Sequence, residues 1–261
     1  MQYPIITITS DTGADGYMIP VMKGHILSRL PEVKIIDISH SIKRYDLNAA
    51  GFVLGSCWFE FPEGTLHLLP IEEPKDSSHR RFLLAGKDGH RFMLEDNGVI
   101  DLLLMGQQAD WVRRFDVEPW QLSTPHKDIY ANYSVEVFRR QLNDPPGIPI
   151  NDYIKGGFPS VYIDESGIVC EAIHIDQWGN VITNLSRTVM LNYSLGKPIQ
   201  LTYRNRQIIE DLVDNAQNIP SGEQYLSYGM GDYLQICIKH GNASELLGLG
   251  MKSKFEISIK G

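Results

Sequence analysis

The chain has 261 residues, of which 43% are hydrophobic and 21% are charged, and this composition excludes a fibre or a disordered chain. A net charge of -8 disfavours nucleic acid as a partner, because phosphate backbones are bound by clustered positive charge. No apolar run approaches the roughly 20 residues of a membrane span, and the N-terminus lacks the pattern of a signal peptide. We therefore expect a cytoplasmic protein with neither nucleic-acid nor membrane partners.

Cofactor fingerprints and metal-ligand spacings are absent from the sequence. Cys57, Cys170 and Cys237 are odd in number and far apart, which argues against a disulfide framework. There is no His-Glu-x-x-His, no Gly-x-Ser-x-Gly and no glycine-rich phosphate loop. Histidines, cysteines and carboxylates form no group with the spacing of metal ligands. We expect buried free thiols, no metal and no cofactor.

Strands and helices are predicted to alternate in the first half of the chain, from the spacing of apolar residues and turn signals. The predicted elements are, in chain order, strand 4–9, helix 17–30, strand 33–38, helix 47–54, strand 65–71, strands 81–85 and 91–94 around the turn at 87–89, and helix 98–105. Asp46 and Asp128 are expected to cap helices that begin at Leu47 and Ile129. The alternation predicts an α/β domain with a mostly parallel sheet and flanking helices.

The second half has a different character. Four prolines and the pair Gly156-Gly157 between residues 143 and 167 indicate a long irregular connection. Beyond it the predicted strands are 168–175, 181–185, 198–203, 233–238 and 255–259, which favour a small all-β barrel or sandwich. We expect an α/β domain over residues 1–158, a linker over 159–167 and a β domain over 168–261.

Two acids follow the first predicted strand. In open α/β sheets ligands bind beyond the carboxyl ends of the strands, and Asp11 lies directly after this strand. One carboxylate can accept hydrogen bonds from both hydroxyls of a ribose diol, although a turn residue that satisfies its own backbone is an equal alternative. Asp15 could face a ligand ammonium or cap the following helix.

Further candidates lie in polar segments. Glu73 and Arg80 stand seven residues apart after the strand 65–71, where they could converge on a small molecule or form a solvated loop. His126 precedes a predicted helix, a common place for a surface histidine. Residues 176–180, Asp-Gln-Trp-Gly-Asn, combine acid, aromatic and amide side chains between two β segments, as a plain hairpin turn also would.

Short motifs along nearly the whole chain occur in a characteristic order. They lie at residues 9–13, 22–24, 36–40, 61–67, 95–98, 128–131, 176–184 and 241–248. Together they resemble the S-adenosyl-L-methionine (SAM) hydroxide adenosyltransferase family, to which the fluorinating and chlorinating enzymes are related. The resemblance implies an N-terminal α/β domain, a C-terminal β-barrel, and a homotrimer with each active site between the first domain of one subunit and the second domain of a neighbour.

The resemblance also implies a reaction, in which water displaces methionine from C5′ of SAM and gives adenosine and L-methionine. In the first domain Asp11 matches the acid that binds the ribose diol, and Asp15 matches the acid near the methionine ammonium. The family's catalytic set is an acid, an arginine seven residues later and a histidine. Glu73, Arg80 and His126 are the residues that match it, the last if its loop is one residue shorter than usual.

In the second domain the resemblance implies contacts to all parts of the substrate. Asp176 and Asn180 match the pair that holds methionine and ribose. Trp178 stands where the family has an aromatic residue against adenine. Asn242 and Ala243 fall where backbone groups recognise the adenine edge.

Three functions remain open from the sequence. Hydrolysis of SAM by water attack is the interpretation that the resemblance favours. A homologue that binds SAM or adenosine without catalysis is the alternative. The sequence leaves open which of His79 and His126, if either, faces C5′. A SAM-dependent halogenase is the third, although Glu73 would repel a halide.

Overall fold

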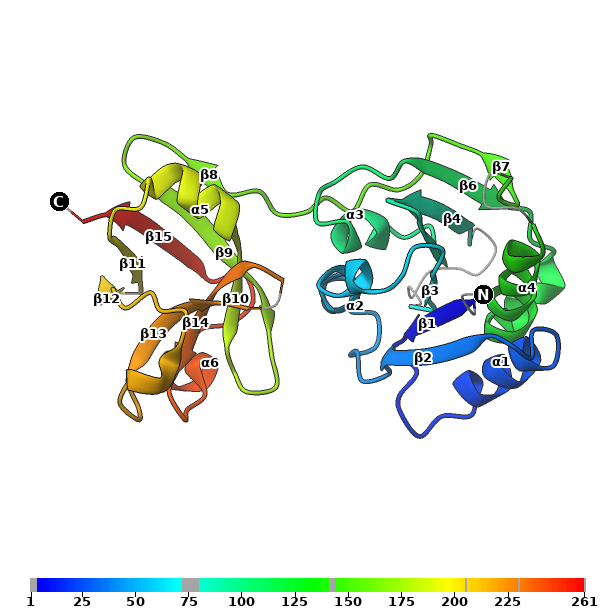
Figure 1. Cartoon of the computed structure of the whole chain (residues 1–261), viewed down its shortest axis with the longest axis horizontal. Coiled ribbons are helices and arrows are strands. Elements are labelled where there is room, and N and C mark those ends of the chain that lie inside the picture. The colour runs from blue at the N-terminus through cyan, green and yellow to red at the C-terminus, as the bar shows by residue number, and fades with distance from the viewer. Residues whose placement is uncertain (1–3, 72–79, 141–143, 205, 230, 261) are drawn as a thin grey trace. The chain divides into compact units, whose positions relative to one another are not determined.

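The computed structural model describes residues 4–71, 80–140, 144–204, 206–229 and 231–260. The chain divides into two compact units, Met1–Phe158 and Pro159–Gly261 (Figure 1). The first unit mixes helices and strands, whereas the second consists mainly of strands. This organisation confirms the predicted fold class, an α/β region followed by a β region.

The first unit is built on one mixed sheet. Its elements are β1 (Ile5–Thr9), α1 (Met18–Leu27), β2 (Lys34–Ser39), α2 (Leu47–Gly55), η1 (Trp58–Glu60), β3 (Leu66–Leu69), β4 (Phe82–Lys87), β5 (His90–Glu95), α3 (Val99–Leu103), β6 (Trp111–Phe115), η3 (Pro119–Ser123), η4 (His126–Ala131), α4 (Asn132–Arg139) and β7 (Ile148–Pro149). The strand order is β2-β1-β3-β5-β4-β6-β7. Strands β2, β1, β3 and β5 are parallel to one another, and β4, β6 and β7 pair antiparallel. The carboxyl ends of the four parallel strands therefore meet at one edge of the sheet.

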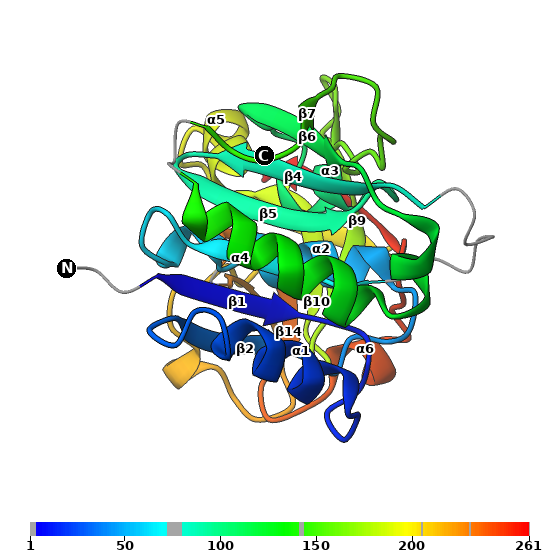
Figure 2. The same ribbon diagram turned by 90° about the vertical axis from the view of Figure 1, so that its right-hand side faces the viewer.

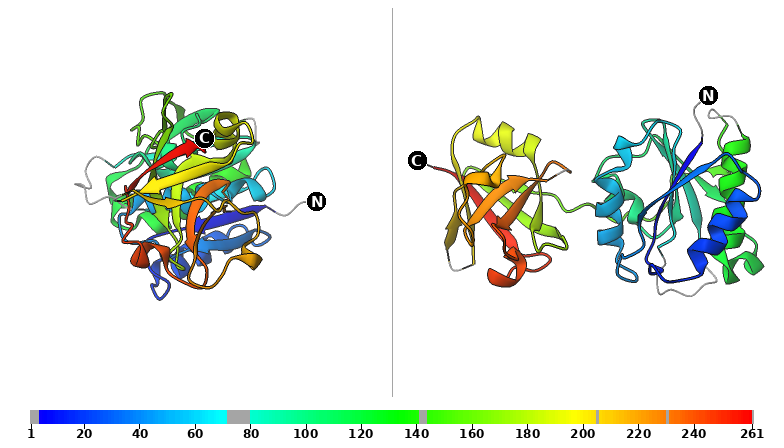
Figure 3. Two further views of the ribbon diagram at one scale, coloured as in Figure 1. Left: turned by 90° about the vertical axis from the view of Figure 1, so that its left-hand side faces the viewer. Right: turned by 60° about the horizontal axis from the view of Figure 1, so that its bottom comes forward.

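Helices cover both faces of this sheet (Figures 2 and 3). On one face α1, η4 and α4 pack against β1 and β3, and on the other α2 and α3 pack against β3 and β5. Ile19, Met22 and Ile26 are the buried residues of α1, at the three- and four-residue spacing that predicts this helix. Gly51 lets α2 approach α3, because a Cβ there would lie 2.5 Å from the Cβ of Leu102. Among the described residues no helix is long and apolar enough to cross a membrane.

The second unit is a strongly curved antiparallel sheet. Its elements are β8 (Tyr162–Ile163), β9 (Ile168–Ile175), β10 (Val181–Ser186), α5 (Arg187–Ser194), β11 (Ile199–Tyr203), β12 (Gln207–Ile209), η5 (Ala216–Asn218), β13 (Gln224–Tyr228), β14 (Tyr233–Ile238), α6 (Ala243–Leu246) and β15 (Lys254–Ile259). The strand order is β12-β11-β15-β9-β10-β14-β13, with β8 on β9. Leu226 of β13 donates its N–H to the carbonyl of Asp211 at 2.7 Å, just beyond β12. This contact between the two outer strands nearly closes the sheet into a barrel around one apolar core.

The sequence patterns missed several elements. The sequence does not predict strands β6, β12 and β13. In β6 the apolar pattern is interrupted by Arg113 and Arg114, and β12 has only three residues. In β13 Leu226 is the one fully buried residue. The expectation that Asp128 caps a helix beginning at Ile129 is wrong. The helical segment begins at His126 in a π-helical turn, and Asp128 lies inside it with its carboxylate accepting from Thr124 Oγ1.

The three cysteines are free thiols. Cys170 and Cys237 are buried and Cys57 is half-buried, so the expectation of buried thiols holds for two of them. Burial raises the pKa of Cys57 to about 11 and that of Cys170 to about 12. Because the thiolate is the reactive form, these side chains are inert near neutral pH.

A pair of buried histidines spans the centre of the first sheet. His67 Nδ1 lies 2.7 Å from Thr7 Oγ1, and His67 Nε2 lies 3.1 Å from His90 Nδ1. Both rings are almost completely shielded from solvent. Burial, together with the neighbouring His90, lowers the pKa of His67 to about 3, and burial also lowers the pKa of His90. Both histidines are therefore neutral in the folded protein at neutral pH.

This burial predicts acid sensitivity of the first unit. The folded-state pKa of His67, about 3, lies below its ordinary value of 6.5, so the unfolded chain binds more protons and stability falls as the pH drops below 6.5. Between pH 7 and pH 5 the loss attributable to His67 is about 2 kcal/mol. His67→Gln should remove that part of the pH dependence, measured by urea unfolding followed through tryptophan fluorescence. If the unfolding free energy of His67→Gln still differed between pH 7 and pH 5 by as much as that of the wild type, the prediction would be wrong. His240→Gln in the second unit is the control.

Candidate functional site

Asp11 lies at the edge of the first sheet where the parallel strands end. Ser10, the residue after β1, donates its N–H to the carbonyl of Ser39 at the end of β2, at 2.8 Å. Asp11 is half-buried, and its Oδ2 accepts the N–H of Tyr45 at 2.9 Å. The carboxylate is thus fixed by the segment that follows β2. Asp15 lies farther along the same loop and is exposed, so it can meet a ligand from solvent.

A network of polar side chains holds the loop that carries Asp11. Ser10 Oγ lies 2.7 Å from His40 Nδ1, and His40 Nε2 lies 3.1 Å from Asp37 Oδ1. Lys23 of α1 completes this network, because its Nζ lies 2.5 Å from Asp37 Oδ2. Burial opposes ionisation of Asp37, but the hydrogen bonds from Lys23 and His40 outweigh it and lower the pKa of this carboxyl. The network links β1, β2 and α1 beneath Asp11.

Arg80 is bound to Glu95, the last residue of β5. Its Nε and Nη2 donate to Glu95 Oε1 and Oε2 at 2.8 and 2.7 Å, a bidentate pair. The two side chains are 11% and 6% exposed. The guanidinium also lies over the ring of Phe82, 5.4 Å from its centroid. Arg80 is therefore held in one orientation at the edge where β5 ends.

His126 lies near the end of β3. It begins the π-helical turn η4 and is 5% exposed, and such turns often occur at functional sites. Its ring centroid is 6.2 Å from that of Tyr130, whose hydroxyl donates to the carbonyl of Leu69, the last residue of β3, at 2.9 Å. Tyr130 also packs edge-on against Phe82 at 5.8 Å. Tyr130 and Phe82 thus connect the surroundings of His126 and Arg80.

The predicted residues of the first unit are arranged along this edge. Asp11 follows β1, Arg80 is attached to the end of β5, and His126 is linked to the end of β3, the strand between them. Glu73 and His79 lie outside the described residues, and their roles stay predictions. In the described part of the chain, no group of three or more histidine, cysteine and carboxylate side chains could hold a metal ion.

The segment 176–180 forms the β9–β10 hairpin of the second unit. Asp176 Oδ1 accepts the N–H groups of Trp178 and Asn180, each at 2.9 Å, and its Oδ2 accepts Asn180 Nδ2 at 2.8 Å. Asp176 and Asn180 are both half-buried, whereas Trp178 at the tip is 77% exposed. The carboxylate organises the turn and leaves the indole in solvent, where a large aromatic ring often marks a contact surface.

The loop before α6 packs on this hairpin. Gly179 adopts φ +80°, and a Cβ there would lie 1.9 Å from Asn242 Oδ1. Its carbonyl accepts the N–H of Ser244 at 2.9 Å, and Ala243, the residue before Ser244, is fully buried. Asn242 caps α6 by accepting the N–H of Glu245 at 3.0 Å. The structure therefore brings the predicted residues of the second unit together, in the hairpin and the loop that packs on it.

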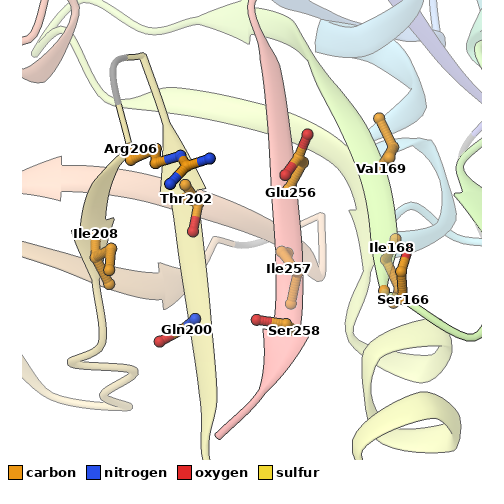
Figure 4. A pocket seen from close by; sticks show the side chains of 11 residues that line it. Ser166, Ile168, Val169, Gln200, Thr202, Arg206, Ile208, Glu256, Ile257 and Ser258 are labelled. Carbon is orange, nitrogen blue, oxygen red and sulfur yellow. The ribbon is translucent and has the colours of Figure 1, made fainter.

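A separate groove lies elsewhere on the second unit (Figure 4). It has a volume of about 460 Å³ and is lined by the start of β9, by side chains of β11, β12 and β15 such as Gln200 and Glu256, and by Arg206 between β11 and β12. The hairpin 176–180 follows the opposite end of β9. The described residues that line the groove include none of the predicted set, so the groove is distinct from the candidate site.

Sequence reasoning missed two residues of the first site. Glu95 was noted as part of a motif but not as the partner of Arg80, and Tyr130 was assigned no role. A signal for Glu95 was present, because the turn at 87–89 fixes a hairpin register that places Glu95 opposite Phe82, two residues from Arg80. The position of Tyr130 depends on the π-helical turn, for which the sequence gives no comparable signal.

Comparison with known proteins identifies the family. Residues 6–144 match the SAM hydroxide adenosyltransferase N-terminal domain, and residues 170–256 match the C-terminal domain of the same family. The chain belongs to the SAM hydroxide adenosyltransferase family. Both matches cover the predicted site residues of their unit, from Asp11 to His126 in the first and from Asp176 to Ala243 in the second.

Several relatives of this family member carry enzyme names. A protein of Methanocaldococcus jannaschii named (R)-S-adenosyl-L-methionine hydrolase is 28% identical over 215 residues, which cover 80% of this chain and 77% of that protein. A protein of Salinispora tropica with the same name is 24% identical and covers 94% of both chains. A fluorinase of an Actinoplanes species is 22% identical over 76% of this chain and 77% of its own.

Solved structures share the fold of this SAM hydroxide adenosyltransferase homologue. An uncharacterised conserved protein from Thermotoga maritima superposes with a TM-score of 0.84 at 19% identity, covering 97% of this chain and 99% of its own. A conserved hypothetical protein from Thermus thermophilus gives a TM-score of 0.75 at 18% identity, covering 98% and 100%. At these identities the likeness establishes the fold.

The contact between the hairpin and the α6 loop predicts a specific effect of Gly179→Ala. The substitution combines backbone strain with a clash against Asn242, whereas Gly222→Ala, at φ +87° with nothing within 4 Å, introduces the strain alone. We expect the control to lose about 1 kcal/mol of unfolding free energy and Gly179→Ala to lose about 1–3 kcal/mol more. Hydrogen exchange of the Ser244 amide should accelerate in Gly179→Ala. Equal losses and equal exchange in both variants would refute the packing.

Proposed function

We propose that this protein hydrolyses SAM: water attacks C5′, the C5′–sulfur bond breaks, and the products are adenosine, L-methionine and one proton. The arrangement of Asp11, Arg80 and His126 along the carboxyl edge of one sheet is the structural observation that carries the proposal. The family matches in both units and the names of the relatives support it. No metal or cofactor is needed for this chemistry, because the sulfonium leaves as a neutral thioether.

Each residue of the first unit has a role in this proposal. Asp11 accepts hydrogen bonds from the 2′- and 3′-hydroxyls of the ribose, and its Oδ2 is already oriented by the Tyr45 N–H. Asp15, on the exposed loop, faces the methionine ammonium. His126 removes a proton from the attacking water, and Arg80 polarises that water and fixes its position. Glu73 is the remaining acid of the predicted set and assists the same water.

The second unit supplies the substrate's other contacts. Asp176 and Asn180 hold methionine and ribose, Trp178 packs against adenine, and the backbone at Asn242 and Ala243 recognises the adenine edge. The rigid hydrogen bonding between Asp176 and Asn180 supports this role, because a preorganised site loses little entropy on binding. We propose a homotrimer in which these residues meet the Asp11 edge of a neighbouring subunit.

The chemistry favours a site that excludes water. A hydroxide-like oxygen and a sulfonium carry opposite charges, which cancel as the new bond forms and the old one breaks. A site with few other waters therefore stabilises the transition state relative to the separated charges. Holding oxygen, C5′ and sulfur in line supplies a further large part of the rate.

Adenosine formation tests the proposal directly. The purified protein incubated with SAM should release adenosine and methionine in equal amounts, measured by chromatography. His126→Gln should lower kcat by about 10²–10⁴-fold, the usual contribution of a general base, with a small effect on KM. His25→Gln in α1 is the matched control and should retain full activity.

The assay separates the competing functions. Tight SAM binding without adenosine from the wild-type protein would indicate a binding homologue and would overturn the proposal. A 5′-halogenated nucleoside formed in the presence of fluoride or chloride would indicate a halogenase. Full activity of His126→Gln would remove His126 from the mechanism and leave His79 as the histidine to test.

The intersubunit site makes a second prediction. Asp11→Asn and Asn180→Ala each disable a different half of the site, so each variant alone should be nearly inactive. When the two are mixed under conditions that exchange subunits, a shared site should recover about a quarter of wild-type activity, because random trimers bring two intact halves together at that frequency. Sedimentation should give a trimer. No recovery in exchanged trimers would contradict the shared site.

A further inference from the structure

The pairing of Arg80 with Glu95 involves an acid that the family's catalytic pattern does not include. That pattern places an acid seven residues before the arginine, which is Glu73 in this chain. A carboxylate at the end of β5 binds Arg80 through two hydrogen bonds of 2.8 and 2.7 Å. Glu95 is the last residue of a strand whose residues are all buried, so its backbone position is fixed by the sheet.

The geometry of the pair determines how Arg80 is presented. A guanidinium is planar and carries its donors in a fixed fork. Because Nε and Nη2 are directed at Glu95, the edge with Nη1 is turned away from that carboxylate. The face of the guanidinium lies over Phe82, which packs on Tyr130 beside His126. Arg80 is thus restrained both along one edge and over one face.

Glu95 also offsets the positive charge of Arg80. A buried arginine without a carboxylate partner would attract small anions, whereas a carboxylate bound to it at 2.7–2.8 Å weakens that attraction. The pair can still direct N–H groups at a water oxygen, since its charges are separated in space. This arrangement suits a water nucleophile and offers little attraction to a halide.

We propose that Glu95 is a positioning residue for hydrolysis, which fixes the guanidinium of Arg80 against the attacking water and weakens its attraction for anions. This inference rests on the proposed SAM hydrolysis. Glu95 acts through Arg80, so its removal should lower kcat more than it changes KM. The adjacent pair of Arg81 with Asp96, 3.0 Å apart, serves a different purpose, because Asp96 accepts the N–H of Ile154 at 2.7 Å and ties down the end of the first unit.

The experiment compares Glu95→Gln with Asp96→Asn, since each removes the charge of a buried acid that pairs with a neighbouring arginine. Glu95→Gln should lower kcat for adenosine formation by about 10²-fold, the cost of misplacing a reacting group by about 1 Å, with KM changed less than threefold. Asp96→Asn should lose thermal stability to a similar degree and keep kcat within about twofold of wild type.

Chemical rescue distinguishes positioning from a structural defect. In Glu95→Ala, acetate should restore part of kcat with a saturable dependence, because a carboxylate can again bind the guanidinium through two hydrogen bonds. Chloride at the same ionic strength should restore nothing. If Glu95→Gln fails to fold, Glu95→Asp, which keeps the charge and shortens the side chain, should fold and show a smaller loss of kcat.

The outcomes are distinct. Wild-type kcat in Glu95→Gln, an equal loss in Asp96→Asn, or no rescue by acetate would each overturn the role of Glu95 while adenosine formation by the wild-type protein still stands. A wild-type protein that forms no adenosine would overturn the proposed function and, with it, this inference.

Discussion

Parallel pairing of β2, β1, β3 and β5 is the constraint on which the first site depends. Parallel strands all end at the same edge of a sheet, so residues far apart in sequence become neighbours without a dedicated connection. Asp11 follows β1, Tyr130 binds the last carbonyl of β3, and Glu95 ends β5. Antiparallel pairing of any of these strands would send its terminal side chain to the opposite edge. The helices on both faces are what make this parallel arrangement stable, since they bury both sides of the sheet.

Several polar groups at this edge are paired with one another or with the backbone. Arg80 and Glu95 form a bidentate pair, and the hydroxyl of Tyr130 donates to Leu69. Removing one member of such a buried pair usually costs about 3–5 kcal/mol, because the remaining charge is left without compensation. The edge is therefore stiff before substrate arrives. Stiffness of this kind is useful in a displacement reaction, whose rate depends on alignment more than on strong acids or bases.

The second unit also holds its candidate residues in place, but through a single hairpin turn and not through a sheet edge. Its hairpin depends on one carboxylate, that of Asp176, which accepts three hydrogen bonds within five residues. Gly179 then allows the α6 loop to lie against the hairpin at a distance that no side chain would permit. The turn could be predicted from local sequence, because Asp, Gly and Asn are ordinary turn residues. The contact of this turn with residues 242–244 could not be predicted, since the contact joins segments about sixty positions apart.

The difference between local sequence signals and contacts of distant segments also explains which other predictions succeeded. Buried strands and the amphipathic helix α1 follow from periodicity, and the β4–β5 hairpin follows from Asp88-Gly89, both of which adopt positive φ. The π-helical turn at His126 and the strand β13 carry no such pattern, because tertiary contacts select them. Asp11, Arg80 and His126 could be chosen from sequence by position and resemblance, but the partner of Arg80 required the register of two strands.

Incubation of the purified protein with SAM in ¹⁸O-labelled water tests the central claim most directly. If water attacks C5′, mass spectrometry should find the label in the 5′-hydroxyl of adenosine and none in methionine. Adenosine without the label, or label recovered in the methionine product, would contradict attack at C5′ and the function proposed for this sheet edge.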